Sequence, residues 1–319
     1  MADPEIPPPA SGPVTPPTPP PPPNTVFRGP NGIRAGWRVL IFLAISAGIG
    51  IFLGLALGLV LALFVHGKTY LATISQLTPL GLSISEAAIL FLTAVPALIM
   101  ARIERRHFGQ YGLPLHSAFR GRFWTGTLAG FLAISACLLA IFAFHGFRLT
   151  GLAIHGSAIL SATLAWGITF VMVGLAEEFS FRGYLQFTLT TGMGFWPSAI
   201  VLSLLFAGAH ARNPGESKTG LLSVLMFGLL FCFFLRRTGN LWFPVGFHAG
   251  WDWGQTFFYG VPDSGILPYH NLFRCSFSGP AWLTGGSVGP EASIFAFIVL
   301  LVAGIVFAGV CRENRYPAP

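Results

Sequence analysis

The chain has 319 residues, of which 53% are hydrophobic and only 9% are charged. A composition this apolar lies outside the range of soluble domains and is typical of a protein that crosses a membrane several times. The formal net charge is +7, but no run or stripe of Lys and Arg accompanies it, so the sequence predicts no nucleic-acid partner.

The N-terminal segment, residues 1–32, is rich in proline. It holds 13 of the 25 prolines, five of them in succession from Pro19 to Pro23. Such a segment favours polyproline II and cannot bury a core, so we expect a disordered cytoplasmic tail. Residues 33–312 are predicted to form one membrane domain, and residues 313–319 a short cytoplasmic tail.

Eight apolar runs follow the tail. They cover residues 37–65, 84–100, 123–144, 159–175, 195–209, 221–235, 241–259 and 292–310. About 20 residues cross the hydrocarbon core as a helix, so most of these runs are long enough and the rest are lengthened by their flanks. The sequence therefore predicts an all-α, polytopic membrane protein with about eight transmembrane helices in one bundle.

The distribution of Lys and Arg predicts the orientation. With eight spans, 13 of the 18 basic residues fall on the side of the two termini and five on the other side. Cytoplasmic loops carry the excess of basic residues, which predicts a multi-pass protein of the cell membrane with both termini in the cytoplasm. The longest internal loop, residues 260–290, is then an external connection, and its Asp263 belongs to no motif.

The most costly cluster of charges is Glu177, Glu178 and Arg182, which lies among apolar residues. Each charge in a membrane segment costs about 2.5–3.5 kcal/mol on insertion scales. Glu178 and Arg182 are four residues apart and share a helix face, so they can pair. Glu177 lies about 100° around the helix and is free to face another group. The alternative is a purely structural ion pair that fastens two helices.

Two further polar positions interrupt later runs. His210 closes one of them, and it is either an interfacial residue or a functional one. His248 and Asp252 share a helix face, with small residues between them that permit close helix approach. Taken separately, this pair could be a structural hydrogen bond flanked by interfacial tryptophans.

The three segments together offer carboxylates, imidazoles and a guanidinium on separate helices. Hydrolysis of a peptide bond by water needs a base for the water, a donor for the oxyanion and an acid for the leaving amine. The same residue types also bind zinc, although there is no His-Glu-x-x-His motif. No serine or cysteine lies in a nucleophile context, which favours water as the nucleophile.

The three motifs resemble the CPBP intramembrane endopeptidases, which include the CAAX prenyl endoproteases of the Ras-converting type and bacteriocin-processing and immunity proteins. The pattern Glu-Glu-x-x-x-Arg is matched at residues 177–182, Phe-x-x-x-His at 206–210, and His-x-x-x-Asn/Asp at 248–252. Each motif is short, but the ordered set of three within an eight-helix chain is specific. The resemblance covers residues 37–259.

The resemblance implies an endopeptidase with its site inside the bundle. Glu177 and His210 would activate the water, and His248 with Asp252 would stabilise the oxyanion or complete a metal site. Glu178 and Arg182 would hold the helix and tune the site. If a metal such as zinc is present, the candidate ligands are Glu177, His210 and His248, but a metal-free glutamate mechanism is equally compatible with the sequence.

Asp252 departs from the pattern, because an Asn is familiar at this position. Asn can donate a hydrogen bond to an oxyanion and an ionised Asp cannot, so Asp252 either stays protonated, orients His248 or binds a metal. Of these roles, we favour the orientation of His248. A second expectation concerns depth in the membrane: Glu177 can meet His210 only if the fourth helix continues through the motif or if the fifth helix begins deep in the membrane. We predict a long fourth helix, over residues 158–189, with Glu177 near its middle.

The predicted partners are a peptide or protein substrate and the lipid bilayer. Cleavage of prenylated substrates is not implied by the motifs themselves. The alternative hypothesis is a non-proteolytic membrane protein, such as an immunity or scaffold protein or a transporter, that uses the same buried charges.

Overall fold

The computed structural model describes residues 25–29, 32–64, 78–213, 215–265 and 269–317. Most of the Pro-rich tail, for which disorder was predicted, lies outside these residues. Ten α-helices are described, in the order α1 (Ala35–Phe64), α3 (Pro79–Glu104), α4 (Gly121–Ala143), α5 (Ser157–Arg182), α6 (Tyr184–Met193), α7 (Phe195–His210), α8 (Lys218–Thr238), α9 (Trp242–Asp252), α10 (Ala281–Thr284) and α11 (Ile294–Val310).

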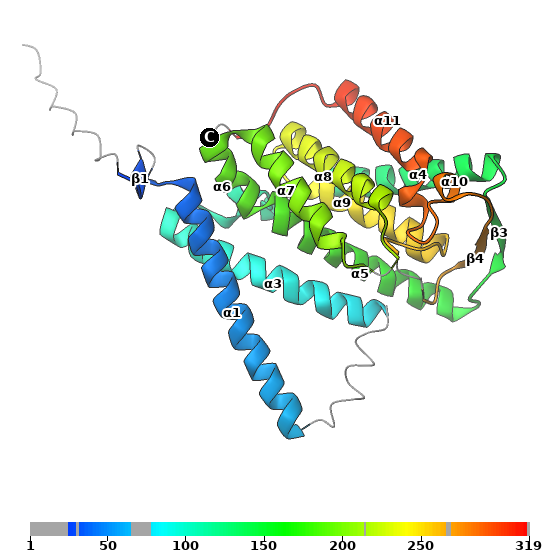
Figure 1. The fold of residues 1–319 in the computed structure, drawn as a ribbon, viewed down its shortest axis with the longest axis horizontal. Helices are drawn as coiled ribbons and strands as arrows, with labels where there is room; N and C mark the ends of the chain where they lie inside the picture. The colour runs from blue at the N-terminus through cyan, green and yellow to red at the C-terminus, as the bar shows by residue number, and fades with distance from the viewer. Residues whose placement is uncertain (1–24, 30–31, 65–77, 214, 266–268, 318–319) are drawn as a thin grey trace, which may run out of the picture.

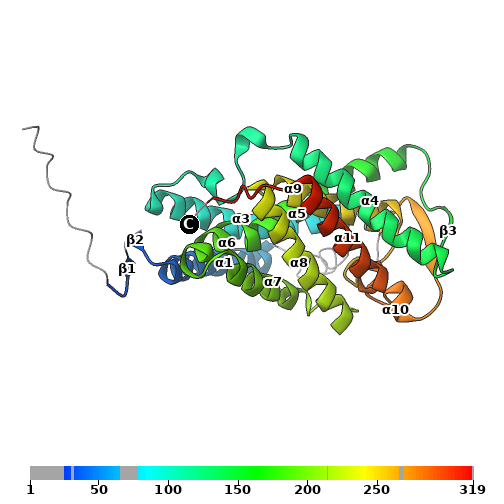
Figure 2. The same ribbon diagram turned by 90° about the horizontal axis from the view of Figure 1, so that it is seen from above.

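The helices form a bundle from which α1 leans outward, and Figure 1 and Figure 2 show this arrangement from two directions. Within the described residues, each of the eight predicted apolar runs lies mostly in a helix. Five spans are long and apolar enough to cross a membrane by length and composition, and α7 and α11 are shorter apolar helices. The protein is an all-α polytopic membrane protein, as predicted.

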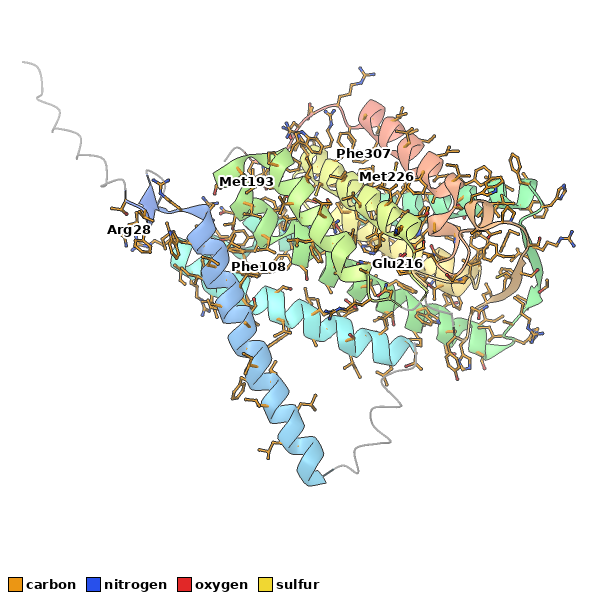
Figure 3. The ribbon with its side chains drawn as sticks, in the orientation of Figure 1. Arg28, Phe108, Met193, Glu216, Met226 and Phe307 are labelled. Atoms are coloured by element: carbon orange, nitrogen blue, oxygen red, sulfur yellow. The ribbon has the colours of Figure 1, made fainter. Side chains whose placement is uncertain are left out.

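The main hydrophobic core lies between α4, α8, α9 and α11. Phe307 of α11 packs its ring 4.5 Å from that of Phe234 and 4.6 Å from that of Phe243. Met226 packs against the same core, and Figure 3 labels it beside Phe307. This core holds α9, which carries His248, against the helices on either side.

The fourth predicted helix ends earlier than expected. It runs through the first motif, as the depth argument required, but α5 stops at Arg182 rather than at residue 189. Gly183 leaves the helical region (φ −81°, ψ −125°), and a Cβ there would lie only 2.4 Å from the carbonyl oxygen of Phe179. The chain turns at this glycine and continues as α6, so the predicted helix is two helices joined at a bend.

Close contact between α4 and α9 rests on two pairs of glycines. A Cβ at Gly126 or Gly130 of α4 would lie 2.4 or 2.0 Å from a carbonyl oxygen of α9. A Cβ at Gly246 or Gly250 of α9 would lie 2.1 or 2.0 Å from a carbonyl oxygen of α4. Only helices with small residues at both positions of a Gly-x-x-x-Gly pattern can approach so closely. The backbone of α9 is therefore fixed by its contact with α4.

Replacing Gly250 with alanine is expected to destabilise the protein by about 1–3 kcal/mol or more, because the new methyl group meets backbone that cannot rotate away. Thermal unfolding in detergent measures the loss. The matched control is Gly54→Ala in α1, where an added Cβ meets nothing within 4 Å and stability should change little. Equal melting temperatures for the two variants would contradict the proposed role of the glycine contact.

The loop after α9 is folded against the bundle. Trp253–Phe258 continues α9 as a turn of π-helix, and β4 (Phe273–Phe277) pairs antiparallel with β3 (Phe147–Leu152). A second short antiparallel pair, β1 (Arg28–Gly29) and β2 (Gly32–Ile33), precedes α1. Through this loop, polar residues beyond α9 reach the interior of the bundle.

Candidate active site

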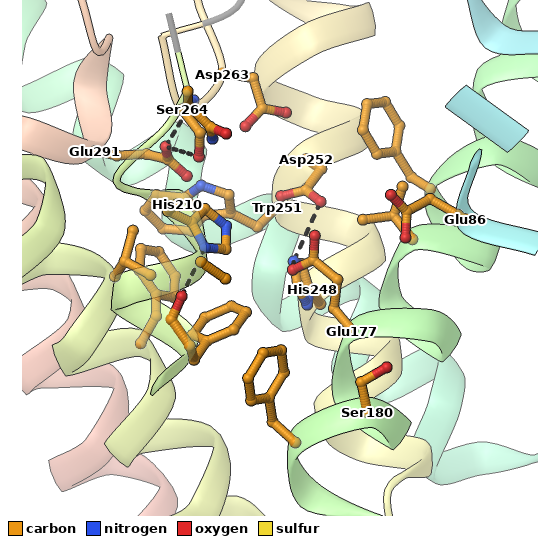
Figure 4. A pocket seen from close by; sticks show the side chains of 18 of the residues that line it. Glu86, Glu177, Ser180, His210, His248, Trp251, Asp252, Asp263, Ser264 and Glu291 are labelled. Carbon is orange, nitrogen blue, oxygen red and sulfur yellow. Dashed lines mark hydrogen bonds and ion pairs between the residues drawn. The ribbon is translucent and has the colours of Figure 1, made fainter. Parts of the chain in front are cut away.

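A cavity of about 470 Å³ lies among α3, α5, α7, α8, α9 and the segments that follow α9 and precede α11. Figure 4 shows its lining from close by. The titratable groups that line it are Glu86, Glu177, His210, His248, Asp252, Asp263 and Glu291. The histidines and carboxylates of the three sequence motifs thus meet at one cavity, apart from Glu178, which lies behind it.

Glu178 and Arg182 form the predicted ion pair, one turn apart on α5. Arg182 Nη1 donates to Glu178 Oε1 at 3.2 Å, and both side chains are fully buried. The guanidinium also lies 4.2 Å from the ring centroid of Phe206 on α7, a favourable cation–π contact. Arg182 therefore ties the first motif to the first residue of the second motif.

Space for Arg182 depends on a residue that the sequence analysis did not identify. A Cβ at Gly228 of α8 would lie 2.9 Å from Arg182 Nη2 and equally close to Ser203 of α7. Gly228 lies in an ordinary apolar run, so the sequence does not show that a larger side chain would be excluded at this position. The structure identifies it as the position where α8 makes room for the guanidinium.

His248 on α9 lies among three carboxylates. Its Nδ1 is 3.0 Å from Glu178 Oε1, and its Nε2 is 3.6 Å from Glu177 Oε2 and 3.4 Å from Asp252 Oδ2. Phe231 of α8 stacks on the ring, with centroids 5.3 Å apart. Each ring nitrogen therefore faces an acceptor, and the orientation of the imidazole is fixed on both sides. Glu178 contacts both Arg182 and His248, so its part in the site is larger than the ion pair alone.

His210 lies across the cavity from Glu177 and His248, as Figure 4 shows. Its Nδ1 is 2.9 Å from the carbonyl oxygen of Phe206, one turn earlier on α7. A carbonyl only accepts hydrogen bonds, so Nδ1 carries the hydrogen and the neutral ring presents Nε2 as an acceptor. The ring of Phe206 also packs edge-on against that of His210 at 4.7 Å, which links His210 to Arg182 through one aromatic side chain.

Three acids that line the cavity, Glu86, Asp263 and Glu291, were not predicted as site residues. Asp263 and Glu291 form a cluster with Asp252, in which one carboxylate oxygen of each residue lies within 4.8 Å of those of the other two. Glu86 of α3 lines the opposite wall, where its Oε2 is buried without a hydrogen-bond partner among the described residues. Asp263 and Glu291 come from loops without a motif, so no sequence signal placed them beside Asp252.

Burial controls the titration of the two loop acids. Burial raises the pKa of Asp263 to about 6, although the hydroxyl of Thr256, which donates to Oδ2 at 2.6 Å, opposes the change. Burial also raises the pKa of Glu291 to about 7, and the neighbouring charge of Asp263 adds to this. Ser264 opposes it by donating its backbone N–H and its hydroxyl to Glu291 Oε2, each at 3.0 Å.

These pKa values predict that the protein loses stability as the pH rises from about 4 to about 7. A carboxyl group whose pKa is raised by folding binds more protons in the folded state than in the unfolded one, so the free energy of unfolding falls through this range. The expected loss is of order a few kcal/mol. Other charged groups that act on Asp263 or Glu291 are His248, His210 and Glu177.

Thermal unfolding between pH 4 and pH 8 checks this prediction. The double variant Asp263→Asn/Glu291→Gln should show a flatter dependence on pH than the parent protein. Glu313→Gln, which removes an exposed carboxylate near the C-terminus, should keep the full slope. A slope that is unchanged in the double variant would show that other groups cause it.

The candidate zinc ligands Glu177, His210 and His248 do not converge as a metal site would require. Within the described part of the chain, the close set of possible ligands is the carboxylate cluster, which has no nitrogen or sulfur donor of the kind zinc prefers. His210 Nδ1 is bonded to a carbonyl and His248 Nδ1 faces Glu178, contacts that leave Nε2 of each ring as the nitrogen that could meet a metal. As placed, Glu177, His210 and His248 are not close enough to one another to form a preformed zinc site.

Comparison with known proteins agrees with the motifs. Residues 159–254 match the family described as type II CAAX prenyl endopeptidase Rce1-like. This match supports a CPBP/CAAX protease family assignment. No curated protein matches the chain. Together with the apolar helices, the family match supports a multi-pass membrane protein with a CAAX-type protease function in general terms.

The matched segment covers less than a third of the chain, but it contains all three motifs. It begins in α5 and ends just after Asp252. Glu86, Asp263 and Glu291 lie outside it. The cavity therefore combines a wall from the matched segment with acids from elements beyond that segment.

Proposed function

We propose that this protein is an intramembrane endopeptidase that hydrolyses peptide bonds with a water activated by Glu177 and His210. The observation that carries the proposal is the state of the Glu177 carboxylate. Its Oε2 has no hydrogen-bond donor among the described residues, although it lies 3.6 Å from His248 and lines a cavity with His210. A carboxylate held without a donor, beside space for a water, is suited to act as a base.

In the proposed reaction, Glu177 takes a proton from water as the oxygen attacks the scissile carbonyl carbon. Glu177 then gives this proton to His210 Nε2, whose lone pair is directed away from Phe206, and His210 passes it to the amine nitrogen as the C–N bond breaks. General acid–base catalysis of this kind contributes about 10²–10⁴-fold to a rate. Both groups come from helices that Arg182 ties together, which keeps their relative position fixed.

His248 is proposed to stabilise the negative oxygen of the tetrahedral intermediate. A hydrogen on Nε2, which faces Glu177 and Asp252, is available to an oxyanion at that edge of the cavity. Electrostatic stabilisation by a preorganised donor is often the largest contribution to such a reaction. Asp252 is proposed to orient His248 rather than to donate to the oxyanion itself.

The substrate is proposed to be a peptide or protein segment that enters the cavity from the bilayer. A cell-membrane location with both termini in the cytoplasm is part of the proposal, and the distribution of basic residues supports it. No requirement for a prenyl group is part of the proposal, and neither is a metal-dependent step.

The test uses the full-length protein reconstituted in liposomes with a library of membrane peptides, with products identified by mass spectrometry. His210→Gln should reduce cleavage by about 10²-fold or more. The matched control is His107→Gln, because His107 is exposed in the loop after α3 and lines no part of the cavity. Loss of activity in both variants, or in neither, would contradict the proposed role of His210.

The competing hypothesis is a transporter or scaffold protein that uses the same charges without hydrolysis. It predicts no cleavage products from any peptide by the parent protein. Partner binding or solute transport would then survive the His210→Gln substitution. Detection of defined cleavage products that depend on His210 would exclude it.

A further inference from the structure

A second cavity, of about 800 Å³, lies on the side of the bundle away from the candidate active site. One face of α4 and one face of α11 form its walls, and residues of α8 and α9 form its floor. The two walls lie side by side in Figure 1 and Figure 2. They touch at one end, where the rings of Phe144 and Phe295 are 5.3 Å apart, and we call the space that extends from there the α4–α11 groove.

The length of the groove is apolar. Its walls include Ala129, Ala133 and Leu132 of α4 and Ala303 of α11, and its floor includes Phe243. Because the alanine side chains on the two walls are small, the space between α4 and α11 stays open.

The neighbouring outer surfaces are apolar as well. Leu128 of α4 is 58% exposed, as is Leu301 of α11, and Ile305 is 63% exposed. In a polytopic membrane protein such surfaces face lipid chains rather than water. The outer surfaces of the two helices that flank the groove therefore face the hydrocarbon of the bilayer.

The end of the groove away from Phe144 is strongly basic. Four arginines line it, together with a single acid: Arg122, Arg237, Arg312, Arg315 and Glu313. They come from the start of α4, the last turn of α8 and the residues after α11, which all lie at the same end of the bundle. Four positive charges against one negative charge leave this end electrostatically unbalanced.

The existing contacts of these arginines do not remove the imbalance. Arg122 Nη1 donates to the carbonyl oxygen of Thr238, and Arg312 Nε donates to that of Gly309. Both acceptors are neutral, and each bond uses one of five N–H donors. Arg315 pairs with Glu313 at 3.0 Å, but this pair is exposed and contributes little.

We propose that the α4–α11 groove binds an anionic phospholipid, with one acyl chain in the apolar groove and the phosphate among the arginines. A phosphate oxygen accepts hydrogen bonds from guanidinium groups in a bidentate geometry, which favours arginine at such sites. Basic pockets between transmembrane helices bind anionic head groups in this way. The apolar length of the groove can hold an acyl chain, and the arginines where the helices end can bind the phosphate. These two parts are arranged as they are in a phospholipid.

This site is independent of the proposed protease. It shares no lining residue with the candidate active site and would exist in a transporter or scaffold of the same fold. Failure of one proposal leaves the other standing, because lipid binding can be measured without any substrate.

The test measures lipid binding to the full-length protein in detergent by native mass spectrometry, with phosphatidylglycerol and phosphatidylcholine of identical acyl chains. We expect phosphatidylglycerol to remain bound and to raise the melting temperature, and phosphatidylcholine to do neither. The double variant Arg312→Gln/Arg315→Gln should weaken phosphatidylglycerol binding by about tenfold or more, because charge-assisted hydrogen bonds are lost.

A second variant tests the acyl chain. Ala303→Phe narrows the groove without changing a charge and should weaken phosphatidylglycerol binding to a similar degree. Arg105→Gln, at an exposed position outside the groove, is the matched control and should bind as the parent does. The proposal is overturned if phosphatidylcholine binds equally well, if inorganic phosphate alone gives the same stabilisation, or if neither variant weakens binding.

Discussion

Replacing Glu177 with glutamine is expected to reduce peptide hydrolysis by about 10²–10⁴-fold while the protein stays folded. Glutamine has nearly the same shape as glutamate but cannot take a proton from water, so the change removes the proposed base and little else. The Glu177 carboxylate is not the main contact that positions His248, since it lies 3.6 Å from the ring and the Glu178 carboxylate lies 3.0 Å from it. The rate of product formation in liposomes measures the effect, and the melting temperature verifies the fold.

The matched control for this variant is Glu86→Gln, which removes a second carboxylate from the lining of the same cavity. Glu86 contacts none of the motif residues through a described hydrogen bond or ion pair, so its loss should lower the rate far less. An equal loss of activity in the two variants would mean that the charge of the cavity matters and not the base at position 177. Full activity of Glu177→Gln would remove the basis of the proposed mechanism.

The buried ion pair predicts the largest effect on stability. Arg182→Met is expected to cost about 3–5 kcal/mol, because it leaves the carboxylate of Glu178 without its cation at a position with no exposure to solvent. The same change removes the cation that lies over Phe206, so α5 and α7 lose their charged connection. Thermal unfolding in detergent is the direct measurement.

Two further proteins separate charge from packing. The double variant Arg182→Met/Glu178→Gln removes both charges and should recover part of the lost stability, since no uncompensated ion remains. Arg106→Met is the control at an exposed arginine whose nearest carboxylate oxygen is 4.0 Å away, and it should change stability little. A double variant that is less stable than Arg182→Met alone would assign the effect to packing.

The sequence predicts the helices well, because a membrane restricts the possible structures. The backbone N–H and C=O groups of each apolar run must form hydrogen bonds within the run, because the bilayer core offers no water. An apolar run of sufficient length therefore predicts a helix. The contacts within motifs are also local: Glu178 with Arg182, and His248 with Asp252, are four residues apart on a helix and had to share a face. The predicted contacts within these pairs are present.

The remaining features depend on distant segments or on backbone detail. Asp263 and Glu291 reach Asp252 through irregular loops, whose paths follow from no periodic pattern. The predicted end of α5 was wrong because the sequence does not show that Gly183 leaves the helical region, at a position where a side chain would meet Phe179. Gly228 matters through the guanidinium that packs beside it, a contact that cannot be recognised in a single apolar run.

The glycine contact between α4 and α9 also constrains biosynthesis. About 100 residues separate the end of α4 from the start of α9, so at 5–20 residues per second the ribosome needs on the order of 5–20 s to supply the second helix after the first. Glu177 is added roughly a third of the way through that interval, so for the rest of it the nascent chain contains Glu177 but lacks the helix that carries His248. A partly synthesised chain therefore holds an incomplete site, and it cannot acquire the proposed activity before its own translation is nearly finished.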